Sequence, residues 1–389
     1  MHAFLNSQHH ERGRYGKKMS RNISFPLIAL SFAVVVLYQA FMANVTRRNI
    51  ARVLMKDESS AYDEKNIPRF QYYNVDLNNT EEKLPLPVDY YPVGKGSVIA
   101  LLVSGREQDI EEAKIALKSL AFLKGDIDPD HPSPVLIFNE GDITKEDIVA
   151  IAKSTNRPIS FPRVDFTEFP EGFDPLTEKH SFRVKGRNPW GYYQMIRFWT
   201  TVVWKQAAIE RFENVMRIDS DSCFKEVNDY LPNFKYDGLY YHSQYVGVEP
   251  VHGANYIDGM YQFVEKWMEE KKQPSEPRNA LLWHYATSVW KNDKTLPLFR
   301  TNFELAKREF MQRGDVARFH EALTEKSPFP VLRQRWGDAV LRFLMLAVFE
   351  SPNRVLTVRP TGYFHKQGCS RAEVDNALLN LQRAETKVE

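Results

Sequence analysis

Cysteine is scarce in this 389-residue chain, and neither sign of charge predominates. The 2 cysteines, Cys223 and Cys369, exclude a disulfide-dense scaffold and an all-cysteine zinc site, and they permit one bridge at most. The 52 Lys and Arg residues nearly balance the 50 Asp and Glu residues, which leaves a formal net charge of +2. The chain therefore lacks the basic excess that is typical of nucleic-acid binding, and no nucleic-acid partner is expected.

Two common nucleotide-binding motifs are also missing. The sequence contains no G-x-G-x-x-G turn and no G-x-x-x-x-G-K-[ST] loop, which argues against a dinucleotide-binding fold and a phosphate-loop NTPase. It shows no internal repeat and no low-complexity segment. Hydrophobic residues make up 43% of the chain and charged residues 26%, values that are typical of a folded globular protein.

The sequence has one long hydrophobic run, at residues 22–46, and this run contains no charged residue. About 25 residues make a helix of roughly 37 Å, long enough to span a bilayer. Basic residues precede the run, so the positive-inside rule predicts a cytosolic tail over residues 1–21 and a signal anchor over residues 22–46. A buried core helix and a cleavable signal peptide are the alternatives. Residues 47–94 are expected to form a stem, and residues 95–389 a folded lumenal domain.

The folded part begins with an apolar run at residues 97–104, as expected of a strand that is covered on both faces. A helical stripe follows over residues 109–122, then a strand at residues 134–139 and a helix from about Thr144. This alternation predicts an α/β fold with a mostly parallel central sheet flanked by helices. Further predicted elements are strands at 159–164, 213–218 and 239–248, helices at 190–204, 256–270 and 336–349, and a long surface connection at 165–190.

Two carboxylates stand directly after the predicted strand at residues 213–218. Asp219 and Asp221 are separated by one residue, and in an extended chain side chains at this spacing point to the same face. Converging carboxylates favour a hard divalent cation, which can also bind a diphosphate leaving group. Because ligands of an open α/β sheet bind at the carboxyl ends of strands, this pair predicts a metal site. Two similar pairs within residues 126–130 lie in a proline-containing turn and are expected to be surface residues.

Three other residues could contribute to such a site. His365 follows an aromatic pair late in the chain and could be a metal ligand or an ordinary surface or core histidine. Glu304 and Asp338 each stand near aromatic residues, where a raised pKa would suit general acid–base catalysis. Either acid could instead begin a helix, where the helix dipole stabilises a negative charge.

The segment at residues 191–199 (GYYQMIRFW) has two interpretations. It is typical of an aromatic-rich core helix. Alternatively, Tyr192 and Arg197 face a cleft, where the Arg197 guanidinium could hold a phosphate group through two hydrogen bonds.

Taken in order, these segments resemble the fungal-type α-1,2-mannosyltransferases of glycosyltransferase family 15. That family carries the motifs G-Y-x-x-M-x-R-F, R-V-E-P-D, N-F-E, E-R-W-G-D-A and G-Y-Y-H. The resemblance covers roughly residues 95–370. The corresponding segments of this chain are, in the same order, residues 191–198, 217–221, 302–304, 335–339 and 362–365.

The resemblance implies a GT-A type nucleotide-sugar transferase fold and a retaining enzyme of the Golgi membrane. It also implies Mn2+ as the metal, GDP-mannose as the donor, and a glycan or glycoprotein as the acceptor. Carried over by motif, Asp219, Asp221 and His365 would bind Mn2+. Glu304 would act as the nucleophile or stabilise a cationic transition state. Tyr192 and Asp338 are the other catalytic candidates, and Arg197 is a donor-binding candidate.

The chain departs from the family pattern at the predicted metal site. Asp-Ser-Asp at residues 219–221 replaces Glu-Pro-Asp, which shortens one ligand and removes a proline, so the metal distance or donor preference could change. Cys223 and Cys369 fall near cysteine positions of the family, and their pairing is possible in an oxidising lumen. The alternatives are the same fold with another nucleotide-sugar donor, and a non-catalytic membrane-anchored glycan-binding protein.

Overall fold

The description of the fold begins at Gly96, in a computed structural model of the chain. The predicted tail, signal anchor and stem therefore lie outside the described residues, and so do the Asp pairs within residues 126–130. Within the described part of the chain, no helix has both the length and the apolar character needed to cross a membrane. The residues described are 96–124, 132–178, 190–210, 212–228, 241–243, 246–249, 256–271, 274, 276–357 and 362–386.

A mixed seven-stranded sheet lies at the centre, with the strand order β10-β6-β9-β4-β1-β2-β3. Neighbouring strands are parallel except at β9, which runs antiparallel to both β4 and β6. The predicted, mostly parallel sheet is thus confirmed, with one reversed strand. Its strands are β1 (Ser97–Leu102), β2 (Val135–Phe138), β3 (Ile159–Ser160), β4 (Asn214–Ile218), β6 (Tyr241–Ser243), β9 (Phe303–Lys307) and β10 (Val355–Thr357).

Two small antiparallel sheets accompany the large one. β5 (Ser222–Phe224) pairs with β11 (Tyr363–His365), and β7 (Val246–Glu249) pairs with β8 (Leu296–Phe299). The sequence predicted a single strand over residues 239–248. The structure instead has two strands in this region, β6 and β7, which belong to different sheets.

The helices follow the apolar stripes of the sequence, and all five helices that the sequence predicts are confirmed. Thr144 caps one of them, because its hydroxyl accepts a hydrogen bond from the Asp147 amide at 3.2 Å. After α4 the chain continues in a π-helical turn, Phe198–Val202, and a 3-10 turn, Val203–Lys205. The α-helices are α2 (Glu107–Ser119), α3 (Lys145–Ala152), α4 (Gly191–Arg197), α5 (Ala207–Glu210), α6 (Met260–Lys271), α7 (Ala280–Asp293), α8 (Arg308–Gln312), α9 (Gly314–Thr324), α10 (Pro330–Gln334), α11 (Asp338–Phe349) and α12 (Arg371–Glu385).

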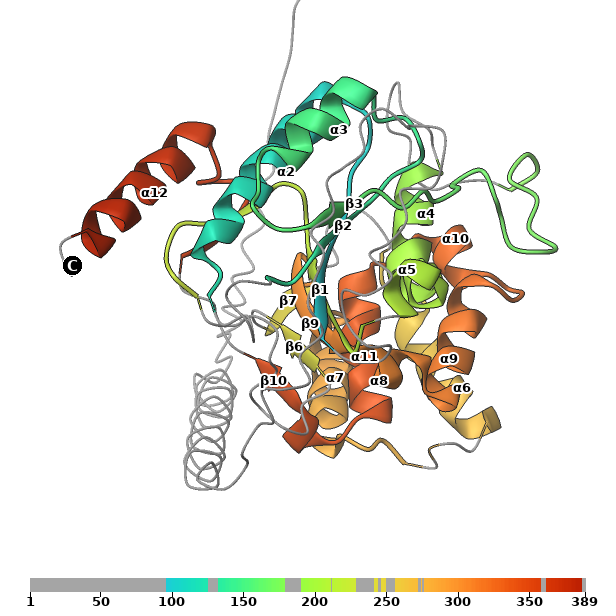
Figure 1. Cartoon of the computed structure of the whole chain (residues 1–389). Helices are drawn as coiled ribbons and strands as arrows, with labels where there is room; N and C mark the ends of the chain where they lie inside the picture. Colours follow the sequence, from blue (N-terminus) through green and yellow to red (C-terminus); the bar gives the residue numbers. More distant parts are fainter. Residues whose placement is uncertain are drawn as a thin grey trace, which may run out of the picture. The chain divides into compact units, whose positions relative to one another are not determined.

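Alternate residues of the central strands face two different layers, as the period of two in a strand requires. One set, which includes Met216, Ile218 and Phe303, packs with α2 in the main apolar core. Figure 1 shows α2 and α3 side by side in this layer. Arg217, between Met216 and Ile218, and Glu304, directly after Phe303, point to the other face of the sheet. There Arg342 of α11 is the charged partner of Glu304. The sheet therefore has an apolar face and a face with buried charges.

The predicted surface connection at residues 165–190 is partly buried, which corrects the sequence-based expectation. Phe173 is only 6% exposed and lies 5.3 Å from the Trp190 ring, measured between ring centroids. Phe329 and Tyr193 also belong to this cluster of aromatic side chains. The burial of these aromatic rings fixes the start of α4.

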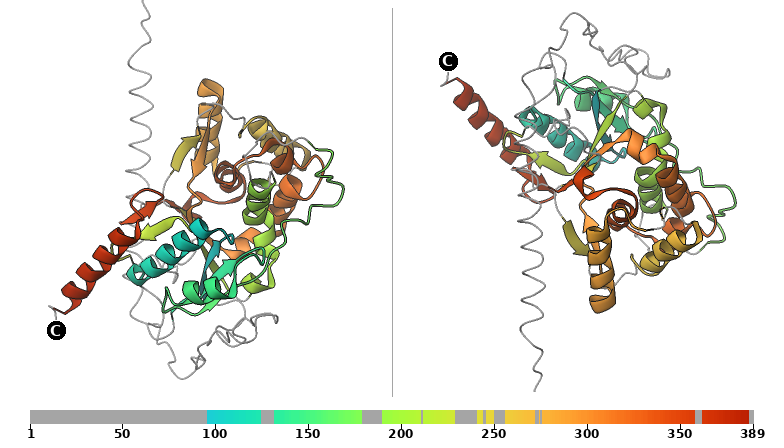
Figure 2. Two further views of the ribbon diagram at one scale, coloured as in Figure 1. Left: turned by 90° about the horizontal axis from the view of Figure 1, so that it is seen from above. Right: turned by 90° about the horizontal axis from the view of Figure 1, so that it is seen from below.

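The last helix, α12, packs along α2. Lys118 Nζ lies 2.6 Å from Asp375 Oδ1, and Arg371 Nη2 lies 2.5 Å from Glu111 Oε2. The two further views in Figure 2 show α12 beside α2 and directly after β11. The chain leading into α12 therefore starts from the small β5–β11 sheet.

Candidate active site

The two candidate metal-binding aspartates lie in a tight turn between β4 and β5. The Ser222 amide donates to the Asp219 carbonyl oxygen at 3.1 Å, and the Asp219 amide donates to the Asn302 carbonyl oxygen at 3.1 Å. The sequence-based argument placed both carboxylates on one face of an extended chain. Instead, the turn brings Asp219 and Asp221 together at the end of β4, so the site is where it was predicted but for a different reason.

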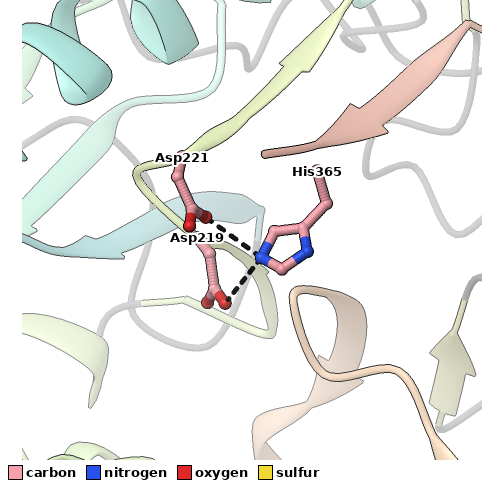
Figure 3. Close-up of side chains that lie close together, drawn as sticks. All are labelled: Asp219, Asp221 and His365. Carbon is pink, nitrogen blue, oxygen red and sulfur yellow. Dashed lines mark ion pairs between the residues drawn. The ribbon is translucent and has the colours of Figure 1, made fainter. Parts of the chain in front are cut away.

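His365 reaches this turn from the far end of the chain. It is the last residue of β11 and lies opposite Ser222 of β5. Its Nε2 atom is 3.1 Å from Asp221 Oδ1 and 3.9 Å from Asp219 Oδ2, as the dashed lines in Figure 3 mark. The structure thus brings together the three residues that the resemblance implied as metal ligands.

These three side chains fit a divalent cation. One ligand atom from each lies within 4.8 Å of the others. Two carboxylate oxygens and one imidazole nitrogen form a donor set that suits Mn2+ and similar ions. Desolvation and the neighbouring Asp221 raise the pKa of Asp219, against the effects of Arg217 and His365. A bound dication would relieve this carboxylate repulsion.

Arg217 is a buried hub beside the metal site. Its Nη1 atom donates to Asp338 Oδ2 at 2.6 Å, its Nη2 atom lies 3.3 Å from Asp219 Oδ1, and Glu304 is within 3.8 Å. The guanidinium also lies over the Trp199 ring, 4.4 Å from its centroid. Burial alone would lower the pKa of Arg217, but the three carboxylates raise it. Arg217 therefore carries a permanent positive charge that fixes Asp219.

Glu304 lies on β9 and is fully buried, so the alternative that it begins a helix is wrong. Its Oε2 atom accepts hydrogen bonds from the Tyr241 hydroxyl at 2.8 Å and from Arg342 Nε at 3.0 Å. Its Oε1 atom accepts from Arg342 Nη2 at 3.3 Å. Both carboxylate oxygens of Glu304 are therefore engaged by neighbouring side chains.

Asp338 is the first residue of α11, as the helix-start alternative predicted. Its carboxylate accepts hydrogen bonds from Arg217 and, at 3.1 Å, from the Thr301 hydroxyl. Burial would raise the pKa of Asp338, but Arg217 outweighs that effect and the pKa is lowered. The raised pKa considered from the sequence is therefore wrong for Asp338, which is held as an anion.

Tyr192 lies near these charges with 42% of its surface exposed. The Arg335 guanidinium stacks between two phenol rings, 4.1 Å from the Tyr192 centroid and 4.1 Å from the Tyr256 centroid. Desolvation and the negative charge of Asp338 raise the pKa of Tyr192 to about 12. Tyr192 is therefore a neutral phenol at physiological pH and can donate a hydrogen bond from the edge of the site.

Arg197 was predicted to face a cleft and hold a phosphate group, but its guanidinium binds other residues of the protein. Its guanidinium makes two hydrogen bonds to Glu325, of 2.8 and 2.7 Å, and a third of 2.7 Å to the Glu168 carbonyl oxygen. These contacts use the guanidinium edge that a diphosphate would need. The position of Arg197 does not support the predicted donor-binding role. Its contacts instead connect α4 to Glu325, which directly follows α9, and to Glu168 in the segment before α4.

Sequence reasoning missed the arginines that organise the buried charges. Arg217 and Arg342 were not among the candidate site residues, although each is a single basic residue within an otherwise apolar segment. That isolation was the available signal, because a charge on a buried strand or helix needs a partner. Tyr241, which donates to Glu304, carried no comparable signal.

The two cysteines form a disulfide, with Cα atoms 5.6 Å apart. The pairing that was left open from the sequence is therefore present. Cys223 is the middle residue of β5, and Cys369 follows β11. The bridge joins the two segments that carry Asp221 and His365.

The family model for glycolipid 2-alpha-mannosyltransferases matches residues 92–383. This chain belongs to that family. A curated relative, the probable mannosyltransferase KTR4 of Saccharomyces cerevisiae, is 21% identical over 295 residues, which cover 70% of this chain and 60% of the relative. The chain thus matches about three fifths of that relative's length.

Solved structures with a similar fold include two mannosyltransferase-family proteins. Core-mannan synthase A from Aspergillus fumigatus, in its Mn/GDP form, is 18% identical with a TM-score of 0.57, covering 78% of this chain and 82% of that one. Ktr4p of S. cerevisiae in complex with GDP is 18% identical with a TM-score of 0.57, covering 83% of this chain and 86% of that one. These similarities confirm the predicted α/β glycosyltransferase fold.

Proposed function

We propose that this chain is a retaining α-1,2-mannosyltransferase with a GT-A fold, which transfers mannose from GDP-mannose to a mannose-containing glycan in protein glycosylation. The observation that carries the proposal is the convergence of Asp219, Asp221 and His365 at the end of β4. Family membership and the Mn/GDP form of the Aspergillus protein support the choice of donor and metal.

In this mechanism Asp219, Asp221 and His365 would hold Mn2+. When bound, the ion stabilises the negative charge of the departing diphosphate. Arg217 keeps the Asp219 carboxylate in place through its contact at 3.3 Å and opposes the rise in the pKa of Asp219. Tyr192 is a neutral phenol and would be available to donate a hydrogen bond at the edge of the site.

The contacts of Glu304 hold its carboxylate in one place, because Arg342 and Tyr241 hydrogen-bond its oxygens. A negative charge that is fixed in this way suits an electrostatic role. We infer that Glu304 provides a fixed, pre-oriented negative charge that stabilises an oxocarbenium-like transition state.

We further propose that the protein is a single-pass type II membrane protein of the Golgi, with its catalytic domain in the lumen. The uncharged run at residues 22–46, preceded by basic residues, supports this location.

The donor is tested by incubating the purified full-length chain in detergent with Mn2+, methyl α-mannoside as acceptor, and GDP-mannose, GDP-fucose, UDP-glucose or UDP-galactose. We expect release of GDP from GDP-mannose and an α-1,2-linked product by NMR. Turnover of a different donor would establish the first alternative. No turnover of any donor, with no Mn2+-dependent GDP binding, would favour the non-catalytic glycan-binding protein.

A matched variant tests the role of Glu304 in the same assay. Glu304→Gln keeps the shape and an acceptor oxygen but removes the negative charge. We expect turnover to fall by about 100-fold or more while GDP binding is retained, because the lost interaction acts in the transition state. Near-normal turnover of a folded Gln variant would contradict the assignment.

A further inference from the structure

The small sheet that carries His365 is separate from the seven-stranded sheet. β5 and β11 have 3 residues each, and among the strands that the structure describes they pair only with one another. Two strands this short are marginally stable without additional support. The position of His365 relative to the turn that carries Asp219 and Asp221 therefore depends on contacts outside the strand pairing.

One end of β11 is well supported. The Tyr363 ring packs against both the Phe224 and the Phe303 rings, with centroids 5.2 Å away in both cases. Its hydroxyl donates to the Asn302 carbonyl oxygen at 2.6 Å. These contacts hold the start of β11, two residues before His365.

The other end of β11 turns back on itself immediately after His365. Lys366 has φ of 64° and Gly368 has φ of 82°, both in the left-handed region. This turn returns the chain to β5, where Cys369 forms the disulfide with the fully buried Cys223. The Lys366 amide donates to the Asp221 carbonyl oxygen at 2.8 Å. The disulfide is the covalent link that closes this turn against β5.

The disulfide lies within four residues of all three metal-binding side chains in the sequence. Cys223 follows Asp221 by two residues, and Cys369 follows His365 by four. The covalent ring closed by the bridge runs from Cys223 to Cys369, so it contains His365, and Asp221 lies just outside it. Across the bridge, a short covalent path of two and four residues connects Asp221 to His365, and this path restricts how far the imidazole can move from the carboxylates, which are 3.1 and 3.9 Å away.

We propose that the Cys223–Cys369 disulfide positions His365 for metal binding. This inference rests on the proposed function, because it assumes that Asp219, Asp221 and His365 hold Mn2+. Without the bridge, the turn after His365 is held to β5 by non-covalent contacts alone, such as the hydrogen bond from the Lys366 amide to Asp221, and the imidazole is less restricted before the metal binds. Loss of support for a metal-ligating side chain typically lowers metal affinity about 10- to 100-fold. We expect a loss of that size here.

If the disulfide had a purely structural role, that role would be to anchor α12, which begins two residues after Cys369. Val374, the fully buried residue of α12, provides the matched control. Val374→Ala loosens the docking of α12 while it leaves the bridge and β11 intact. A bridge that only anchors α12 would give Cys369→Ser and Val374→Ala the same effect on metal binding.

The experiment measures Mn2+ binding to the full-length chain by the EPR signal of free Mn2+, with Tm recorded for each variant. Cys369→Ser is chosen because the remaining Cys223 thiol is buried. We expect Cys369→Ser to bind Mn2+ about 10- to 100-fold more weakly and Val374→Ala to bind within about 2-fold of the unaltered chain. Equal affinities for Cys369→Ser and the unaltered chain would overturn the proposal, as would equal losses in both variants.

If the Cys369→Ser chain does not fold, a second measurement on the unaltered protein takes its place. The folded, unaltered protein is treated with a water-soluble phosphine, which donates two electrons to the S–S bond. The phosphorus takes oxygen from water to become a phosphine oxide, and both sulfurs become thiols. Mn2+ affinity should fall by the same factor, and an unchanged affinity of the fully reduced, folded chain overturns the proposal. If the untreated chain binds no Mn2+, the proposed metal site itself is wrong, which separates the two failures.

Discussion

At the scale of single residues, the site depends on charges that are buried in matched sets. Arg217 pairs with Asp338 and Asp219, and Arg342 pairs with Glu304. A buried charge is costly without its partner, so the loss of one member destabilises more than the loss of both. The acids at these positions could be selected from the sequence, but which arginine pairs with which acid could not be predicted, because 38 residues separate Glu304 from Arg342 and 121 separate Arg217 from Asp338.

A double-mutant cycle on Glu304→Gln and Arg342→Met tests this pairing. Each single change should cost about 3–5 kcal/mol of unfolding free energy, because it leaves a buried charge uncompensated. The double variant should cost less than the sum by about 1–3 kcal/mol. Urea unfolding monitored by circular dichroism measures all four corners.

The exposed Lys266–Glu270 pair of α6, at 3.5 Å, provides the control cycle. It is solvated, so its coupling energy should stay below about 0.5 kcal/mol. If the coupling energy of the Glu304–Arg342 pair is as small as that of the exposed pair, the two buried charges do not stabilise one another as described.

At the scale of elements, the sequence predicted the β–α–β part of the fold better than the elements around it. The runs that became β1 and β2 were recognised because parallel strands covered on both faces have continuous apolar sequences, and β4 was recognised although Arg217 interrupts its apolar run. β9 was not predicted, since Glu304 interrupts its apolar pattern and only the tertiary partners of that carboxylate make a strand possible there. The turn that joins Asp219 to Asp221 was also missed, because it depends on a hydrogen bond from the Asp219 amide to the carbonyl oxygen of Asn302, a residue far along the chain that precedes β9.

Gly362 at the start of β11 offers a test of how this element positions His365. Its φ of 64° is costly for any other residue, and an added Cβ would lie 2.5 Å from Glu226 Cβ and 2.7 Å from the Glu226 amide nitrogen. Gly362→Ala must therefore shift β11 away from β5. We expect a loss of about 2 kcal/mol or more in unfolding free energy, together with weaker Mn2+ binding by calorimetric titration.

Gly314→Ala is the matched control, because its new Cβ would approach only the flexible end of Arg318, at 3.4 Å. A glycine-to-alanine change at the start of α9 should be neutral or stabilise by up to about 1 kcal/mol. A Gly362→Ala chain that equals the Gly314→Ala chain in stability and Mn2+ affinity would show that β11 tolerates the shift.

At the scale of the whole molecule, the site joins distant parts of the chain. The turn after β4, the strand β9 and the start of α11 meet around Arg217, and β11 adds His365 from near the C-terminus. Motif order in the sequence predicted which segments would meet. It could not predict the distances, because these depend on the sheet register and on the disulfide.

Because the ligands come from separate segments, metal binding should stabilise the whole fold. A ligand that binds only the folded state adds about 2.7 kcal/mol at a concentration of 100 times its Kd. Saturating Mn2+ should therefore raise the Tm by roughly 5 °C, and EDTA should reverse the rise. Differential scanning calorimetry on the full-length chain measures both. Asp221→Asn removes one ligand charge and should abolish most of the shift. A shift that survives in this variant would mean that Mn2+ stabilises the fold at a different place.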